Sequence, residues 1–105
     1  MSDRKDFTKQ QQLRHEESVS IDQQIARLEE DVRRLKIDFD IYFNGGSKRP
    51  PYEARGRVEA QIKKLSDKRN LTYSQRYLLN SIISRYNSYK DLWRRIMKAR
   101  NEPFF

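Results

Sequence analysis

A repeating apolar stripe constrains the fold of this chain more than any other feature of its sequence. Apolar or aromatic residues recur at alternating intervals of four and three residues, first between positions 21 and 42 and again between positions 79 and 96. This spacing places the residues on one face of a helix and is typical of helices that pair along a seam. It therefore predicts an all-α fold framed by two long helices. The stripes are Ile21, Ile25, Leu28, Val32, Leu35, Phe39 and Tyr42, then Leu79, Ile82, Tyr86, Tyr89, Trp93 and Ile96.

Capping and turn residues predict where the first long helix begins and ends. Ser20 and Gln23 have the spacing of a capping box, so we expect the helix to start at Ser20. The glycines of Asn44-Gly45-Gly46 end it, which gives a helix over about 20–43. The residues before it are polar and show no periodicity, which is typical of a segment that does not fold. We therefore expect residues 1–18 to form a flexible polar tail.

Two further helices follow the glycine turn. Pro50-Pro51 prevents helix until a second one can start, and an apolar face with Val58, Ile62 and Leu65 then predicts a helix over about 52–69. Thr72 and Gln75 form another capping box, which predicts a third helix over about 72–101, before Pro103. Residues 19–102 are thus a single helical domain, and residues 103–105 are a C-terminal tail.

The width of the apolar faces suggests how the helices pack. Ile37, Ile41 and Phe43 broaden the end of the first helix, and Tyr77, Leu78 and Ile83 broaden the start of the third. If the second helix covers both broad ends, the long helices form an antiparallel hairpin with the second helix as a cap across one end. When the two apolar stripes are aligned in this hairpin, Phe39 lies opposite Ile82, and every large ring lies opposite a smaller aliphatic residue. The alternative is an up-down-up three-helix bundle with parallel first and third helices.

Composition excludes most kinds of catalytic site. The 105 residues are 36% charged and contain no cysteine, so the chain buries only a thin seam and offers no thiolate ligand or nucleophile. His15 is the only histidine and lies in the expected tail, so neither a histidine-based acid–base pair nor a metal site with several histidines can form. No apolar run is long enough for a signal peptide or a membrane span. We expect a soluble, cytoplasmic, non-enzymatic protein with no cofactor, no metal, no small-molecule substrate and no membrane partner.

The net charge of +8 belongs to the second half of the chain. Residues 1–47 contain 8 Lys and Arg against 10 Asp and Glu, whereas residues 48–105 contain 15 against 5. A cluster of cations at one end of a fold can neutralise phosphates, although charged faces also serve only for solubility. The candidate site for nucleic acid or another anion comprises Lys48, Arg49, Arg57, Lys63, Lys64, Lys68, Arg69 and Arg76.

Three tyrosines lie near these cations in the sequence. Tyr52, Tyr73 and Tyr77 could stack on bases, but packing between the second helix and its neighbours would explain them equally well. A second basic group is expected mostly off the seam and is consistent with a solvated helix face. It comprises Arg27, Arg33 and Arg34 with Arg94, Arg95, Lys98 and Arg100.

These features favour a basic helical interaction module that binds nucleic-acid phosphates through its cap, without base specificity. An acidic protein is the other partner that this charge suits. The alternative function is a protein–protein interaction adaptor or a self-associating coiled-coil protein, whose sign would be an uncovered apolar patch.

The segments FDIYFNGGSKRPPYEARGRVEAQIKKL and LTYSQRYLLNSIISRYNSYKDLWRR resemble a group of uncharacterised bacterial helical domains. The resemblance covers about residues 20–100. It implies a bacterial origin, and it carries no known activity and no site residues.

Overall fold

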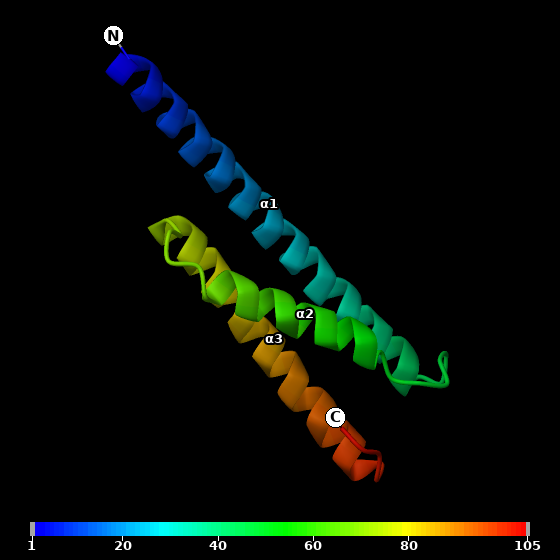
Figure 1. Ribbon diagram of the computed structural model, residues 1–105. Helices are drawn as coiled ribbons and strands as arrows, with labels where there is room; N and C mark the ends of the chain where they lie inside the picture. Colours follow the sequence, from blue (N-terminus) through cyan, green and yellow to red (C-terminus); the bar gives the residue numbers. More distant parts are fainter. Residues whose placement is uncertain (1, 105) are drawn as a thin grey trace.

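Three helices make up the structure, a computed structural model that describes residues 2–104, with side chains described from residue 9 onward. Helix α1 comprises Ser2–Phe43, α2 Tyr52–Ser66 and α3 Tyr73–Ala99. Each helix contacts the other two, and the molecule measures about 69 × 21 × 18 Å. Figure 1 shows α1 and α3 running in the same direction and α2 running back beside them. The predicted all-α fold with three helices is confirmed.

The direction of packing differs from the predicted hairpin. Gln75, in the first turn of α3, donates a hydrogen bond to the Asp22 carboxylate in the first half of α1, at 2.9 Å. Past the other end of α3, Glu102 accepts a hydrogen bond from the Tyr42 hydroxyl at 2.5 Å. Helices α1 and α3 are therefore parallel, and the up-down-up bundle replaces the antiparallel arrangement. The expected cap is wrong for the same reason, because α2 lies alongside both long helices.

Two assumptions behind the hairpin fail for physical reasons. Ile37 and Ile41 are 48% and 44% exposed, so only Phe43 of the three broadening residues of α1 packs against the core. The large rings also pack on one another: Phe39 stacks on Trp93 with ring centroids 4.0 Å apart, and Tyr86 meets Trp93 edge-on. Aromatic stacking of this kind is favourable in itself, so the rings need no smaller aliphatic partners.

Most of the predicted seam positions form the core, and Tyr42 and Tyr89 are only half-buried. The first six residues of the α1 stripe are buried, and Val58 and Leu65 of α2 join them. On α3 the stripe ends at Met97, which is fully buried, whereas Ile96 is only half-buried. The buried core is Ile21, Ile25, Leu28, Val32, Leu35, Phe39, Val58, Leu65, Leu79, Ile82, Tyr86, Trp93 and Met97.

The first helix begins at Ser2, so the start predicted at Ser20 is wrong. Ser20 lies inside α1, where its hydroxyl accepts a hydrogen bond from the Gln24 amide. Residues 2–18, which the sequence assigned to a flexible tail, belong to this helix. No proline or glycine interrupts the sequence between Ser2 and Phe43, so nothing there breaks the helical backbone. Met1 lies outside the described residues.

The other helix ends follow the predicted turn chemistry closely. Gly45 has φ +83°, and the Gly46 amide donates to the Ile41 carbonyl oxygen at 2.8 Å, which closes α1. Thr72 and Gln75 form both hydrogen bonds of the predicted capping box at the start of α3. Helix α2 ends at Ser66 and α3 at Ala99, a few residues before the predicted ends.

The segment after α3 folds back over the bundle. Asn101 has φ 55°, which reverses the chain, and the Tyr52 hydroxyl donates to the Pro103 carbonyl oxygen at 2.6 Å. Phe104 is half-buried and packs against the core. Residues 103 and 104 of the expected tail are thus held against α2, and Phe105 lies outside the described residues.

Candidate functional site

Helix α2 separates the eight predicted site residues into three places. Lys48 and Arg49 lie in the loop before α2, Arg57 lies on α2, and the other five surround its C-terminal end. With 15 residues, α2 is about 22 Å long. The prediction of a single basic cap is therefore wrong in its geometry, because the two ends of α2 lie at different levels of the bundle.

Five of the predicted residues gather where the chain turns from α2 into α3, and we call this group the basic corner: Lys63, Lys64, Lys68, Arg69 and Arg76. Lys63 and Lys64 are in the last turn of α2, and Arg76 follows the start of α3. The Arg76 guanidinium donates to the Lys68 carbonyl oxygen at 3.0 Å, which ties the loop to α3. Asp67 is the only acidic residue between positions 63 and 76.

The positive charge of the basic corner is not compensated by neighbouring carboxylates. Some cations elsewhere pair with acids: Lys90 meets Glu59 at 2.6 Å, and Arg95 meets Asp91 at 2.8 Å. In the part of the chain whose side chains are described, residues 9–104, no ion pair involves a residue of the basic corner. Four of the five side chains are exposed and Lys68 is half-exposed, so all are open to an anion.

A groove between α1 and α2 continues from the basic corner. One hollow of about 350 Å³ is lined by Arg27 of α1 and by Gln61 and Lys64 of α2, among others. A second, of about 430 Å³, shares Arg27 and Gln61 and adds Arg34 and Arg57. Because the two hollows share lining residues, they form one groove that ends at Lys64 of the basic corner. Asp31 and Asp38 also line it, so the groove has mixed charge with an excess of cations.

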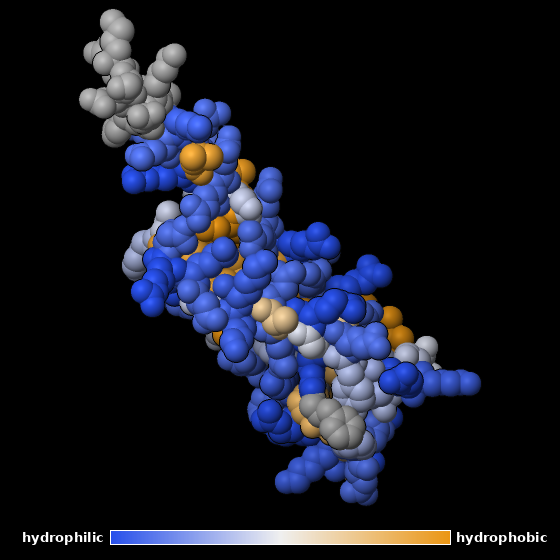
Figure 2. Space-filling model, in the orientation of Figure 1, coloured by the Kyte–Doolittle hydropathy of each residue, from blue (hydrophilic) through white to orange (hydrophobic). Residues whose placement is uncertain are grey.

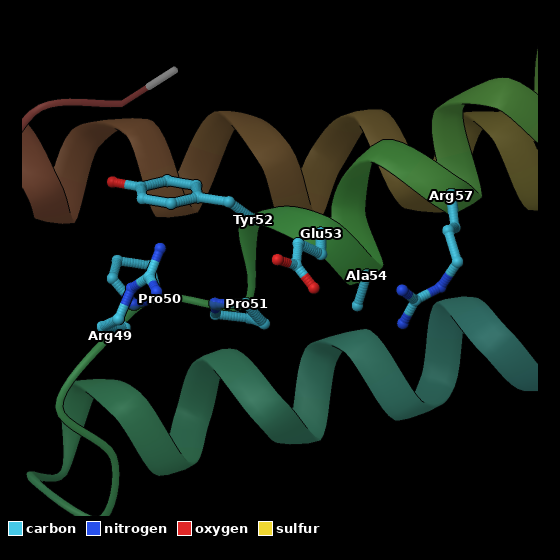
Figure 3. A pocket seen from close by; sticks show the side chains of 7 residues that line it. All are labelled: Arg49, Pro50, Pro51, Tyr52, Glu53, Ala54 and Arg57. Atoms are coloured by element: carbon cyan, nitrogen blue, oxygen red, sulfur yellow. The ribbon is translucent and has the colours of Figure 1, made fainter.

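A third hollow extends the groove to the loop before α2. It has a volume of about 300 Å³ and shares Ala54 and Arg57 with the groove. Figure 3 shows Arg49 and Arg57 at its two ends, with Glu53 between them. The structure thus joins Arg49, Arg57 and Lys64 along one side of α2, although it does not bring them into one cluster. Figure 2 shows that hydrophilic residues cover most of the face drawn there.

The arginines of α1 in this groove belong to the second basic group of the sequence. Arg27 and Arg34 are seven residues apart, so they repeat on one side of α1 and face α2. The sequence placed them off the seam, which is correct, but the direction of α2 decides what they face. Their seven-residue spacing was the sequence feature that could have predicted that they share one side of α1.

Tyr52 differs from Tyr73 and Tyr77. It is half-buried, and its hydroxyl holds the C-terminal segment, so packing explains it. Tyr73 and Tyr77 are 89% and 70% exposed, so packing between helices does not explain them.

A polar network joins α2 and α3 in the middle of the bundle. The Glu59 carboxylate accepts hydrogen bonds from the Tyr86 hydroxyl and the Lys90 ammonium, both at 2.6 Å. Burial alone would raise the pKa of Glu59, but the bonds from Lys90 and Tyr86 outweigh it and lower this pKa. Burial, together with the same hydrogen bond, raises the pKa of Tyr86. The network is structural, since its groups already satisfy one another.

Arg55 is a buried cation that the sequence analysis did not single out. It is 8% exposed, its Nε and Nη1 atoms have no hydrogen-bond partner in the described chain, and its guanidinium lies 4.3 Å from the Phe104 ring centroid. Arg55 lies on the same face of α2 as Val58 and Leu65, and this position in the sequence could have predicted that it is buried. Its burial under Phe104 makes it a packing residue.

Across residues 9–104, whose side chains are described, no group of three or more His, Cys, Asp or Glu residues is placed to hold a metal ion. In the same part of the chain, no helix has the length and apolar character needed to cross a membrane. Comparisons with protein-family models, with curated proteins and with solved structures found no match.

Proposed function

We propose that this protein binds nucleic-acid phosphates through the basic corner and the adjoining groove, without base specificity and without catalysis. One observation carries the proposal: five cations gather at the turn between α2 and α3, and none of them has an ion-pair partner in the described chain. Cations that are left unpaired and exposed are the residues that polyanions recruit. The continuous groove offers a path for a strand that leaves the corner.

The mechanism is phosphate neutralisation. Lys63, Lys64, Lys68, Arg69 and Arg76 each offer a charged donor, and together they displace counterions from a nucleic-acid backbone. Phosphate contacts fix position without reading sequence, so we expect similar affinity for strands of different composition. Arg27 and Arg57 extend these contacts into the groove.

Charge reversal at the corner tests the proposal. Lys63, Lys64 and Lys68 are changed to Glu together, and binding of a fluorescein-labelled 20-nucleotide strand is measured by anisotropy. Three lost phosphate contacts, at roughly 1 kcal/mol each, predict a rise in Kd of about 100-fold. Circular dichroism checks that the helices remain, since none of these side chains is buried.

A matched control removes the same formal charge elsewhere. Arg85, Arg95 and Lys98 are exposed residues of α3 outside the corner, and their change to Glu lowers the net charge equally. We expect this variant to lose less than about fivefold in affinity, because only the diffuse field of the protein weakens. Equal losses in the two variants would contradict a site at the corner, and a wild-type protein that binds no nucleic acid would contradict the proposed function.

A protein–protein adaptor or self-associating protein is the second candidate, and exposed apolar residues favour it. Ile37 and Ile41 are one turn apart on α1 and are 48% and 44% exposed, and Leu13 is 55% exposed. Figure 1 shows the N-terminal part of α1 extending beyond α2 and α3, where no other helix covers it. Sedimentation velocity over a hundredfold range of concentration tests this candidate. A mass that rises with concentration supports self-association, and a constant monomer mass contradicts it.

A further inference from the structure

Two highly exposed tyrosines lie side by side on the outer face of α3. Tyr73 is 89% exposed and Tyr77 is 70% exposed, and the four-residue spacing puts both on one side of the helix, about 6 Å apart along its axis. With Ser74 and Leu78 they line a shallow hollow of about 350 Å³. By contrast, Tyr42, Tyr52 and Tyr86 each donate a hydrogen bond that joins distant parts of the chain. The rings of Tyr73 and Tyr77 are left facing solvent.

The helix that presents these rings is firmly held. Gln75 lies between them in the sequence, is 4% exposed and completes the capping box with Thr72. Its side-chain amide also donates to the Ser18 carbonyl oxygen at 3.2 Å and to the Asp22 carboxylate at 2.9 Å. The first turn of α3 is therefore anchored to α1, and the two rings stand on a fixed backbone.

Three cations of the basic corner lie close to the tyrosines in the sequence. Lys68 and Arg69 precede Tyr73 by a few residues, and Arg76 lies beside Tyr77 and bonds the Lys68 carbonyl oxygen. The cations outnumber the acids here, because Asp67 is the only acidic residue in the sequence between positions 63 and 76. On α1, Glu17 accepts a hydrogen bond from Asn70 and Asp22 accepts one from Gln75. Exposed rings flanked by unpaired cations have the chemistry that binds a single strand, because bases stack on the rings while phosphates meet the cations.

We infer that Tyr73 and Tyr77 form a stacking platform for unpaired bases, so that the ligand is single-stranded rather than duplex nucleic acid. This inference rests on the proposed function, because it names the class of nucleic acid that the basic corner holds. In a duplex the base faces are stacked on one another and cannot reach the rings, whereas every base of a single strand has a free face. Stacking depends little on base identity, which agrees with binding that lacks sequence specificity.

The test compares a single strand with a duplex for three proteins. The probes are a labelled 20-nucleotide oligothymidine and a labelled 20-base-pair duplex, measured by anisotropy at one salt concentration. The proteins are the wild type, the double variant Tyr73→Leu/Tyr77→Leu and the control Tyr73→Phe/Tyr77→Phe. Leucine preserves helix propensity and apolar character but has no ring, and phenylalanine keeps the ring without the hydroxyl.

We expect the Leu variant to lose about 30-fold or more in affinity for the single strand, and the Phe variant to lose less than threefold. Duplex binding, weaker in the wild type, should be the same in all three proteins. Single-strand binding that is unchanged in the Leu variant, or duplex binding that falls equally, would overturn the platform and leave the proposed function standing. A Phe variant as weak as the Leu variant would also overturn it. A wild type that binds neither probe would overturn both the platform and the proposed function.

Discussion

The stacked pair Phe39–Trp93 gives the sharpest test of parallel packing between α1 and α3. The rings are 4.0 Å apart and tilted by only 16°, and both side chains are buried. We expect Phe39→Leu and Trp93→Leu each to lower the free energy of unfolding by about 2 kcal/mol, through lost burial and imperfect refilling of the space. The double variant should lose less than the sum of the two, by about 1 kcal/mol, because the stacking energy can be lost only once.

Urea unfolding followed by circular dichroism measures all four proteins of this cycle. The control cycle pairs Phe39→Leu with Ile82→Val, because an antiparallel hairpin would place Phe39 opposite Ile82. Ile82 lies 11 residues from Trp93 on α3, about 16 Å along the helix, so this second cycle should be additive within about 0.3 kcal/mol. Additivity for Phe39 and Trp93, with coupling between Phe39 and Ile82, would refute the parallel arrangement.

Three further variants test contributions to stability. Glu59→Gln should lower the free energy of unfolding by about 1–2 kcal/mol at pH 7, because it removes the charge that Tyr86 and Lys90 bond. Since the folded protein lowers the pKa of Glu59, its contribution is complete above the unfolded pKa and is lost as the pH falls through the folded pKa. The difference between wild type and variant should therefore shrink from pH 7 to pH 3 in urea titrations, and a constant difference would show that the charge is not responsible. Gly56→Ala should raise the free energy of unfolding by about 0.5–1 kcal/mol, because Gly56 is inside α2 with open space at its Cβ position. Gly45→Ala should lower it by about 1 kcal/mol, because Gly45 has a positive φ; the same sign for both glycine variants in thermal melts would contradict this reasoning.

The local structure of this protein was largely predictable from its sequence. The four-three stripe of α1 identified six buried residues, and the pair Thr72 and Gln75 correctly predicted the start of α3. These features depend on neighbours in the chain, and local rules describe them well. The start of α1 was not predictable in this way, because the Ser20 capping signal also fits a helix interior, where its hydroxyl bonds Gln24.

The same sequence patterns could not predict the direction in which α3 runs. An apolar stripe shows which face of a helix is covered, but it does not show which way the covering helix runs. The apolar residues Ile41 and Leu78 were interpreted as contacts, and both are almost half exposed. The contact that settles the direction, from Gln75 to Asp22, is a long-range polar pair whose members give no joint signal in the sequence.

The residues of the candidate site could be predicted from the sequence, but their arrangement in space could not. Charge counting found all five residues of the basic corner, because a run of cations is visible without a structure. It did not reveal that α2 separates Lys48 and Arg49 from them, nor that Arg27 of α1 faces α2 across a groove. The exposure of Tyr73 and Tyr77 depends on the packing direction of α3, so it too required the fold.

The salt dependence of single-strand binding tests the central claim most directly. If the five cations of the basic corner neutralise phosphates, anisotropy titrations of a labelled oligothymidine between 50 and 300 mM salt should give a slope of log K against log salt of about −3 to −4. The Lys63, Lys64 and Lys68 charge-reversal variant should show a much shallower slope. A wild-type slope near zero, or equal slopes for the two proteins, would contradict binding through the basic corner.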